Sequence, residues 1–302
     1  GLEARFNNFE AGGFSETTTA SFGVDFVVGA EDGAASEATS FGYQMGIGLE
    51  TSFTGEDSLS ATIDIGDGVS GALAFDDTDD VLTLDGLTYT FPVGGATAMV
   101  GDSTDISAVY TGACAYSAFT DYMGNCGTGN SNGVGGNGVT AAMSYAFDSG
   151  FSLAGGISSS NTSILTAEGT DTYGIEAAYS GDSYGVSVAY TDAETTTYWG
   201  INGTYAFDFA TLSAGVESAD ADASDTATGF FVGLSFADVG AGSLDIGMGT
   251  TGNFTDTDTE YYTYEASYAY PVNDGMTITP GVYIVEGATD VTGFAVKTSF
   301  SF

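Results

Sequence analysis

Apolar and polar residues alternate along most of this 302-residue chain. Within residues 40–53, the odd positions from Phe41 to Leu49 are apolar, whereas the even positions carry glycine, Gln44 and Glu50. A period of two is typical of a β-strand whose two faces meet different surroundings. The pattern recurs in 16 segments and therefore predicts an all-β protein with 16 antiparallel strands.

The connections between these segments alternate in length. Short ones, such as residues 148–150 and 181–183, are followed by long ones, such as residues 30–39, 67–80 and 102–138. Strict alternation of this kind is typical of an up-and-down transmembrane barrel, with tight periplasmic turns and larger external loops. An even number of strands places both chain ends on the periplasmic side. A slip in parity at Asp85–Gly86 predicts a β-bulge.

Two domains are expected. Residues 14–302 form the barrel. Residues 1–13 carry Leu2, Phe6 and Phe9 at helical spacing and end at two glycines, which indicates the end of a periplasmic coiled-coil helix or linker; a frayed terminus is the alternative.

The polar positions distinguish a membrane barrel from a soluble sandwich. They are mostly Gly, Ala, Ser and Thr with scattered carboxylates, not the Lys, Arg and Glu mixture of a solvated surface. Aromatic residues gather near the short connections, as in the belts of membrane barrels. The apolar positions therefore face lipid, and an acidic, structural surface-layer protein remains the alternative.

The chain is strongly acidic. It has 41 Asp and Glu residues against Arg5 and Lys297, no histidine, and a formal net charge of −39. Such a charge repels nucleic acid and attracts cations. The missing histidine removes the usual general base, so we expect no enzyme activity.

Sixteen strands enclose an aqueous channel. The alternation places nine charged or amide side chains in that lumen, and we expect Lys297 to pair with a carboxylate such as Asp25. The predicted lumen residues are Asp25, Gln44, Glu50, Asp64, Glu176, Glu217, Asp245, Glu265 and Lys297.

Several stretches resemble the cyanobacterial branch of the OprB-like outer membrane porins, and the similarity runs across nearly the whole chain. They include "GLEARFNNFEAGGFSETTTASFGVDFVVGA", "LDGLTYTFPVGGATAMVGD", "VTAAMSYAFDSGFSLAGGIS" and "YTYEASYAYPVNDGMTITPGVYIV". The resemblance implies a homotrimer of 16-stranded barrels in a cyanobacterial outer membrane. It also implies a preceding signal peptide and an S-layer-homology domain that binds peptidoglycan, neither of which lies in this sequence. The OprB name is tied to carbohydrate transport, whereas the cyanobacterial branch is thought to pass small inorganic solutes, iron among them.

The long segment 102–138 is the third external loop. In general porins this loop folds inward and narrows the pore, and Asp102, Asp105 and Asp121 would then form a carboxylate ring that favours cations. Cys114 and Cys126 lie within it and form either a stabilising disulfide or two free thiols. The alternative is a solvent-exposed loop tip.

Two further features concern partners. The acidic loops, Asp76, Asp77, Asp79 and Asp80 among them, are candidates for loosely bound Ca²⁺ or Mg²⁺, which would bridge to lipopolysaccharide phosphates; simple solvated charge is the alternative. Phe294, Phe300 and Phe302 fit the carboxy-terminal aromatic signal of the outer-membrane insertion machinery, or merely an ordinary last strand. Together these patterns predict an outer membrane porin that passes small hydrophilic solutes and inorganic ions, prefers cations and needs no cofactor.

Overall fold

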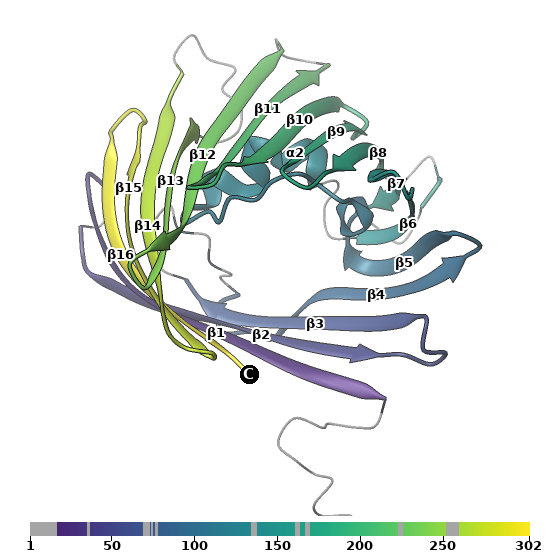
Figure 1. Cartoon of the computed structure of the whole chain (residues 1–302), viewed down its shortest axis with the longest axis horizontal. Helices are drawn as coiled ribbons and strands as arrows, with labels where there is room; N and C mark the ends of the chain where they lie inside the picture. The colour runs from purple at the N-terminus through teal and green to yellow at the C-terminus, as the bar shows by residue number, and fades with distance from the viewer. Residues whose placement is uncertain are drawn as a thin grey trace, which may run out of the picture.

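The computed structural model describes residues 17–34, 37–68, 73, 75, 78–133, 138–160, 164–166, 170–222, 226–251 and 260–302. Within these residues, antiparallel strands close into one barrel, in which β1 pairs with β2 on one side and with β16 on the other (Figure 1). The strands are β1 (Thr18–Asp32), β2 (Ser40–Thr51), β3 (Ser58–Asp67), β4 (Thr83–Val93), β5 (Ala96–Thr104), β6 (Gly138–Ala146), β7 (Phe151–Ser159), β8 (Asp171–Ser180), β9 (Tyr184–Asp192), β10 (Thr196–Ala206), β11 (Thr211–Ala221), β12 (Ala227–Val239), β13 (Gly242–Thr250), β14 (Tyr262–Asn273), β15 (Met276–Val285) and β16 (Val291–Ser301).

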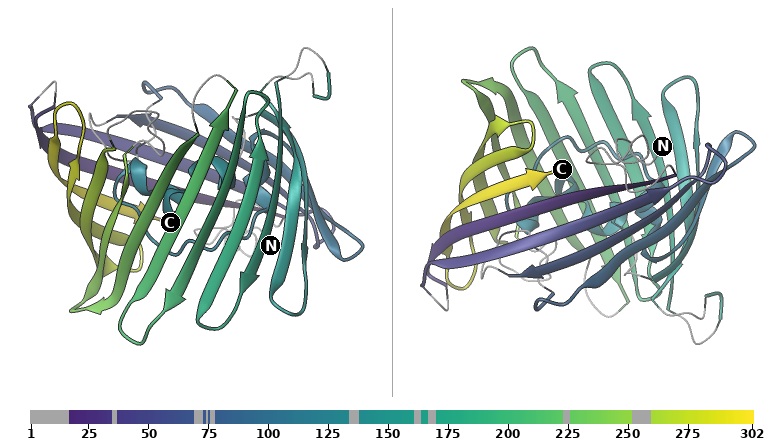
Figure 2. Two further views of the ribbon diagram at one scale, coloured as in Figure 1. Left: turned by 90° about the horizontal axis from the view of Figure 1, so that it is seen from above. Right: turned by 90° about the horizontal axis from the view of Figure 1, so that it is seen from below.

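The predicted 16-stranded up-and-down topology is confirmed. Each strand pairs with its neighbours in sequence, and the strands are inclined across the wall as barrel closure requires (Figure 2). The bulge is also confirmed, because Thr62 pairs with Gly86 and Ile63 with Leu84, which leaves Asp85 as the extra residue. The predicted helix at residues 1–13 lies outside the described residues. No helix in the described part of the chain is long and apolar enough to span a membrane.

The outer surface of the barrel is apolar. Side chains on the outward parity stay exposed although they are large and hydrophobic, for example Phe41 at 62% and Ile175 at 62%. Aromatic pairs lie beside the short turns, among them Tyr145 with Phe147 and Tyr205 with Phe207, each at 4.7 Å between ring centroids. An exposed apolar surface on every side needs an apolar solvent, which a bilayer provides.

The carboxy-terminal aromatic residues lie at the seam between β1 and β16. Phe302 stacks on Phe22 at 5.6 Å, and the backbones of these two residues exchange hydrogen bonds of 2.9 and 3.0 Å. Phe300 meets Phe26 edge-on at 6.2 Å. Phe294 and Phe302 are exposed on the outer face. These contacts close the barrel, and recognition of the same residues by the insertion machinery stays a prediction.

Asp57 organises the short connection between β2 and β3. Its Oδ1 accepts hydrogen bonds from the Phe53 and Thr54 amides at 3.0 and 2.8 Å and from the Ser52 and Thr54 hydroxyls. Its Oδ2 accepts one from the Tyr89 hydroxyl at 2.8 Å. These bonds, the Thr54 amide foremost, hold the pKa of Asp57 well below its ordinary value.

The depressed pKa of Asp57 predicts an acid-dependent contribution to stability. The contribution is present above the unfolded carboxyl pKa, near 3.9, and is lost as pH falls through the lower native value. The unfolding temperature of the wild-type barrel should therefore exceed that of Asp57→Asn at pH 6, and the gap should close towards pH 2. A gap of constant size between pH 6 and pH 2, followed by circular dichroism in detergent, would contradict this.

Candidate pore constriction

The segment between β5 and β6 folds into the barrel (Figure 1). It contains three short helical segments: η1 (Ile106–Val109), η2 (Asp121–Gly127) and α2 (Gly129–Asn132). Because β5 extends to Thr104, this inward loop begins at residue 105, not at 102 as the sequence suggested. Its middle is closed by a disulfide between Cys114 and Cys126, whose Cα atoms are 5.6 Å apart.

A buried glutamate on β14 anchors the middle of the inward loop. Glu265 is 4% exposed. Its Oε1 accepts hydrogen bonds from the Phe119 amide at 2.8 Å and the Tyr116 hydroxyl at 2.9 Å. Its Oε2 accepts from the amide and the hydroxyl of Thr120 at 2.8 and 2.5 Å. Four donors of the loop thus converge on one carboxylate. The buried amide groups of the loop are hydrogen-bonded by this wall residue instead of by water.

Two more glutamates hold the two ends of the loop. On β8, Glu176 accepts hydrogen bonds from the Thr111 and Gly112 amides at 2.7 and 2.8 Å. On β11, Glu217 accepts from the Ser131 amide, and from the amide and side chain of Asn130 at 3.3 and 3.1 Å. Both carboxylates are buried. Each uses both oxygens on main-chain donors, so the geometry fixes the path of the loop.

Neutral wall residues complete the anchoring, and the sequence did not single them out. On β10, the Oδ1 of Asn202 accepts from the Ala113 amide at 3.1 Å, while its Nδ2 donates to the Thr128 hydroxyl at 2.8 Å. On β11, the Ser213 hydroxyl accepts from the Ala115 amide at 3.3 Å. The sequence feature that could have identified Asn202 is its polar amide at an inward position between Ile201 and Gly203.

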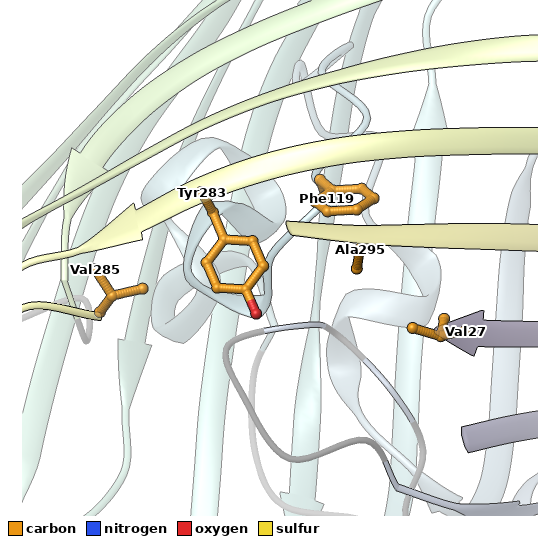
Figure 3. Close-up of a cluster of buried hydrophobic side chains, with 5 residues drawn as sticks. All are labelled: Val27, Phe119, Tyr283, Val285 and Ala295. Carbon is orange, nitrogen blue, oxygen red and sulfur yellow. The ribbon is translucent and has the colours of Figure 1, made fainter. Parts of the chain in front are cut away.

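Apolar contacts reinforce this attachment. Phe119 of the loop packs against Tyr283 of β15 with 6.4 Å between ring centroids, beside Val27 and Ala295 of the wall (Figure 3). Tyr116 packs against Phe231 of β12 at 4.9 Å, in a cluster that includes Met123 and the disulfide. The loop therefore buries both polar and apolar groups against the same side of the barrel.

Glycines on the wall make room for the loop. A Cβ at Gly215 would overlap the carbonyl oxygen of Cys126, and one at Gly281 would overlap the ring of Phe119. The same close approach occurs at inward positions of β10, β11, β12, β13 and β15. These positions are Gly200, Gly215, Gly233, Gly247 and Gly281. Part of the high glycine content is thus a requirement of packing a loop inside the barrel.

Gly215→Ala should displace the loop at Cys126. Overpacking a close contact costs about 1–3 kcal/mol, so we expect a loss of that size in the free energy of unfolding, together with altered single-channel conductance. Gly23→Ala is the matched control, because no other side chain or main chain lies within 4 Å of its Cβ position. Equal behaviour of the two variants in bilayer recordings and unfolding would show that the loop does not press on the wall.

The loop covers one part of the inner wall and leaves another accessible. Inward residues on β8 to β11 are buried, including Ser187 and Ser213, whereas on β1 to β3 Ser21 and Glu50 are exposed and Asp25 and Asp64 are half-buried. The accessible face also holds Gln44, whose Nε2 donates to Asp25 Oδ2 at 2.8 Å. Solvent thus reaches the inner wall on the side of β1 to β3.

The predicted lumen residues consequently fall into two groups. Asp25, Gln44, Glu50 and Asp64 lie on the accessible wall, whereas Glu176, Glu217 and Glu265 face the interior beneath the loop and bind its backbone. Asp245 is also buried and accepts from the Ser235 hydroxyl at 2.5 Å. The expectation that all these carboxylates line water was wrong for the second group, because the alternation places a side chain inside but does not say what covers it.

Lys297 points inward from β16 and lines a small cavity with Val27, Leu73, Phe75 and Phe119. The expected ion pair between Lys297 and Asp25 is not found among the described residues: Asp25 accepts from Gln44, and Lys297 is paired in register with Val27. The physical reason is spacing, because Asp25 is in register with Ser299, two positions further along β16.

The three loop carboxylates named from the sequence lie in different places. Asp102 belongs to β5, opposite the exposed Leu87, on the outer-face parity, so it does not line the interior. Asp105 begins η1 and accepts from the amide and hydroxyl of Ser107 at 2.7 and 2.5 Å; its burial raises its pKa. Asp121 is exposed at the start of η2. The structure does not bring the three together.

Of the proposed Ca²⁺ residues, Asp76 and Asp77 lie outside the described residues. Asp79 and Asp80 occupy a turn with positive φ angles, and Asp80 accepts from the Tyr43 hydroxyl at 2.5 Å. No group of three or more His, Cys, Asp or Glu side chains with a metal-binding arrangement occurs in the described part of the chain.

A closed antiparallel barrel with an apolar exterior and a loop folded inside is the architecture of a membrane pore protein. A family profile for Gram-negative porins matches residues 11–286. The chain therefore belongs to the Gram-negative porin family, whose members are channels of the outer membrane and not enzymes.

Solved porins share the fold at low sequence identity. An anion-selective porin from Comamonas acidovorans is 15% identical, with 95% of this chain and 99% of that chain covered and a TM-score of 0.71. A mutant of the Rh. blastica porin is 16% identical, with 94% and 100% covered and a TM-score of 0.65. OmpTdeltaL8, a loop deletion mutant of an outer membrane protein of Vibrio cholerae, is 10% identical, with 95% and 100% covered and a TM-score of 0.68. No curated protein matches the sequence.

Proposed function

We propose that this porin is a water-filled channel for passive diffusion of small hydrophilic solutes and inorganic ions, and that it prefers cations. The inward loop narrows the lumen, and solutes pass between the loop and the inner wall of β1 to β3. No covalent chemistry is involved. The permeating solute keeps most of its hydration and moves down its gradient.

The charge on the accessible wall carries the proposal. Asp25, Glu50 and Asp64 contribute three carboxylates on neighbouring strands, and the inward loop adds the exposed Asp121. Lys297 is the one basic side chain among the described residues. A lumen lined by one sign of charge raises the local concentration of the opposite ion and lowers that of its own sign.

The finer assignments rest on the resemblance to cyanobacterial OprB-like porins. On that basis we propose a homotrimer in a cyanobacterial outer membrane, with peptidoglycan bound by a domain that precedes this sequence. The scarcity of basic residues favours inorganic cations over anions as the solute, since a carboxylate-lined wall repels anions.

The sign of selectivity tests the proposal. The purified protein is reconstituted in a planar bilayer with a tenfold KCl gradient, and the reversal potential is measured. We expect a potential of the sign set by K⁺, and a smaller magnitude at higher total salt because screening shortens the reach of the wall charges. A reversal potential of the sign set by Cl⁻ would overturn it.

A further inference from the structure

One carboxylate on the outer side of the barrel is buried without a complete set of partners. Asp171 begins β8 and lies two residues before the exposed Tyr173, on the same outward parity, yet it is only 7% exposed. Its Oδ2 accepts a hydrogen bond from the Leu165 amide at 2.9 Å. Its Oδ1 is buried and has no partner among the described residues. An ionised carboxylate in this position is costly unless something satisfies its free oxygen.

A second carboxylate approaches the same residue. Glu194, in the connection between β9 and β10, accepts a hydrogen bond through Oε1 from the Asp171 amide at 3.1 Å. The Glu194 amide in turn donates to Asp192 Oδ1 at 3.2 Å. Negative charge therefore accumulates around Asp171.

No basic side chain among the described residues is placed to neutralise this charge. Lys297, the one such side chain, points inward from β16, and β16 is eight strands away from β8 in the closed barrel. Within the described residues no positive charge compensates these carboxylates, and an external cation would supply it. Hard divalent cations prefer carboxylate oxygens, and Ca²⁺ accepts water and carbonyl oxygens for the rest of its six to eight ligands.

We propose that Asp171 and Glu194 form a binding site for Ca²⁺ at the outer rim of the barrel. The free Oδ1 of Asp171 is the buried ligand, and the Glu194 carboxylate is the exposed one. The bound ion joins the connection between β7 and β8, through Asp171 and its bond to Leu165, with the connection between β9 and β10. Since only two carboxylates contribute, the expected dissociation constant is that of weak extracellular sites, about 10⁻⁴–10⁻³ M. This site is independent of the channel's ion selectivity.

Calorimetric titration of Ca²⁺ into the detergent-solubilised full chain in 150 mM NaCl tests the site. The wild type should show one saturable event above the weak, unsaturated background expected of an acidic chain. Asp171→Asn should abolish the saturable event. Asp290→Asn is the matched control, because Asp290 lies in another connection and also accepts from a single amide, that of Gly287 at 3.3 Å; it should bind as the wild type does.

A second variant protects the test against a folding defect. Glu194 is exposed, so Glu194→Gln should leave the barrel intact, with the same heat-modifiable migration as the wild type, and weaken Ca²⁺ binding at least about tenfold. If Asp171→Asn does not fold, the Ca²⁺ affinity of Glu194→Gln is the test of the proposed site. A wild type without saturable binding, or unchanged affinity in Glu194→Gln or in a folded Asp171→Asn, would overturn the proposal.

Discussion

Replacing Asp25, Glu50 and Asp64 by Asn, Gln and Asn together should lower the ratio of cation to anion permeability about tenfold or more. These carboxylates face the accessible wall, and a unit charge about 7 Å from an ion in water contributes about 0.6 kcal/mol, or a factor of about 3. Three such charges act in the same direction, although salt screens part of their effect. The reversal potential in a KCl gradient measures the change.

The control for this variant removes the same charge elsewhere. Asp182, Asp208 and Asp274 are exposed in the short connections that follow β8, β10 and β14, and their triple Asn variant also removes three negative charges. It should change the permeability ratio much less. If the two triple variants shifted the reversal potential alike, total charge and not the accessible wall would set selectivity.

Glu265→Ala should release the middle of the inward loop. The change leaves the Phe119 and Thr120 amides and the hydroxyls of Thr120 and Tyr116 without their acceptor. Each unsatisfied buried donor costs about 1–3 kcal/mol, so the attached state of this segment should lose several kcal/mol. We expect a larger and noisier single-channel conductance, and cleavage by chymotrypsin near Phe119 and Tyr122.

Asp245→Ala provides the comparison for Glu265. Asp245 is also a buried, inward carboxylate on the adjacent strand, but among the described residues its hydrogen-bond partner is Ser235 of the wall and not the loop. Its removal should leave the conductance and the protease resistance of the loop near their wild-type values. Identical conductance and cleavage in the two variants would show that Glu265 does not hold the loop.

The disulfide and the three glutamates constrain the inward loop in different ways. The Cys114–Cys126 bond closes a short ring within the loop, whereas Glu176, Glu217 and Glu265 attach the loop to β8, β11 and β14. The disulfide limits the shapes that the free loop can take, and the carboxylates select its place on the wall. Some inward carboxylates thus hold the loop in place, and others remain accessible to solvent in the lumen.

The sequence by itself determined the barrel. A side-chain period of two assigns every strand residue to one face, and strict alternation of short and long connections leaves few topologies for 16 strands. The bulge at Asp85 and the inward side of Glu217 or Glu265 follow from the same counting. These features depend only on neighbours along the chain or in register, which is why pattern suffices.

Only the tertiary structure decided what covers each inward residue. Period alone treats Asp25 and Glu265 alike, because both are carboxylates on inward positions. One remains accessible and the other is buried because the loop, described over residues 105–133, packs mainly against β8 to β16, where acceptors and glycines accommodate its backbone. That choice depends on contacts between residues more than 140 positions apart, such as Thr120 and Glu265, and no local pattern encodes them.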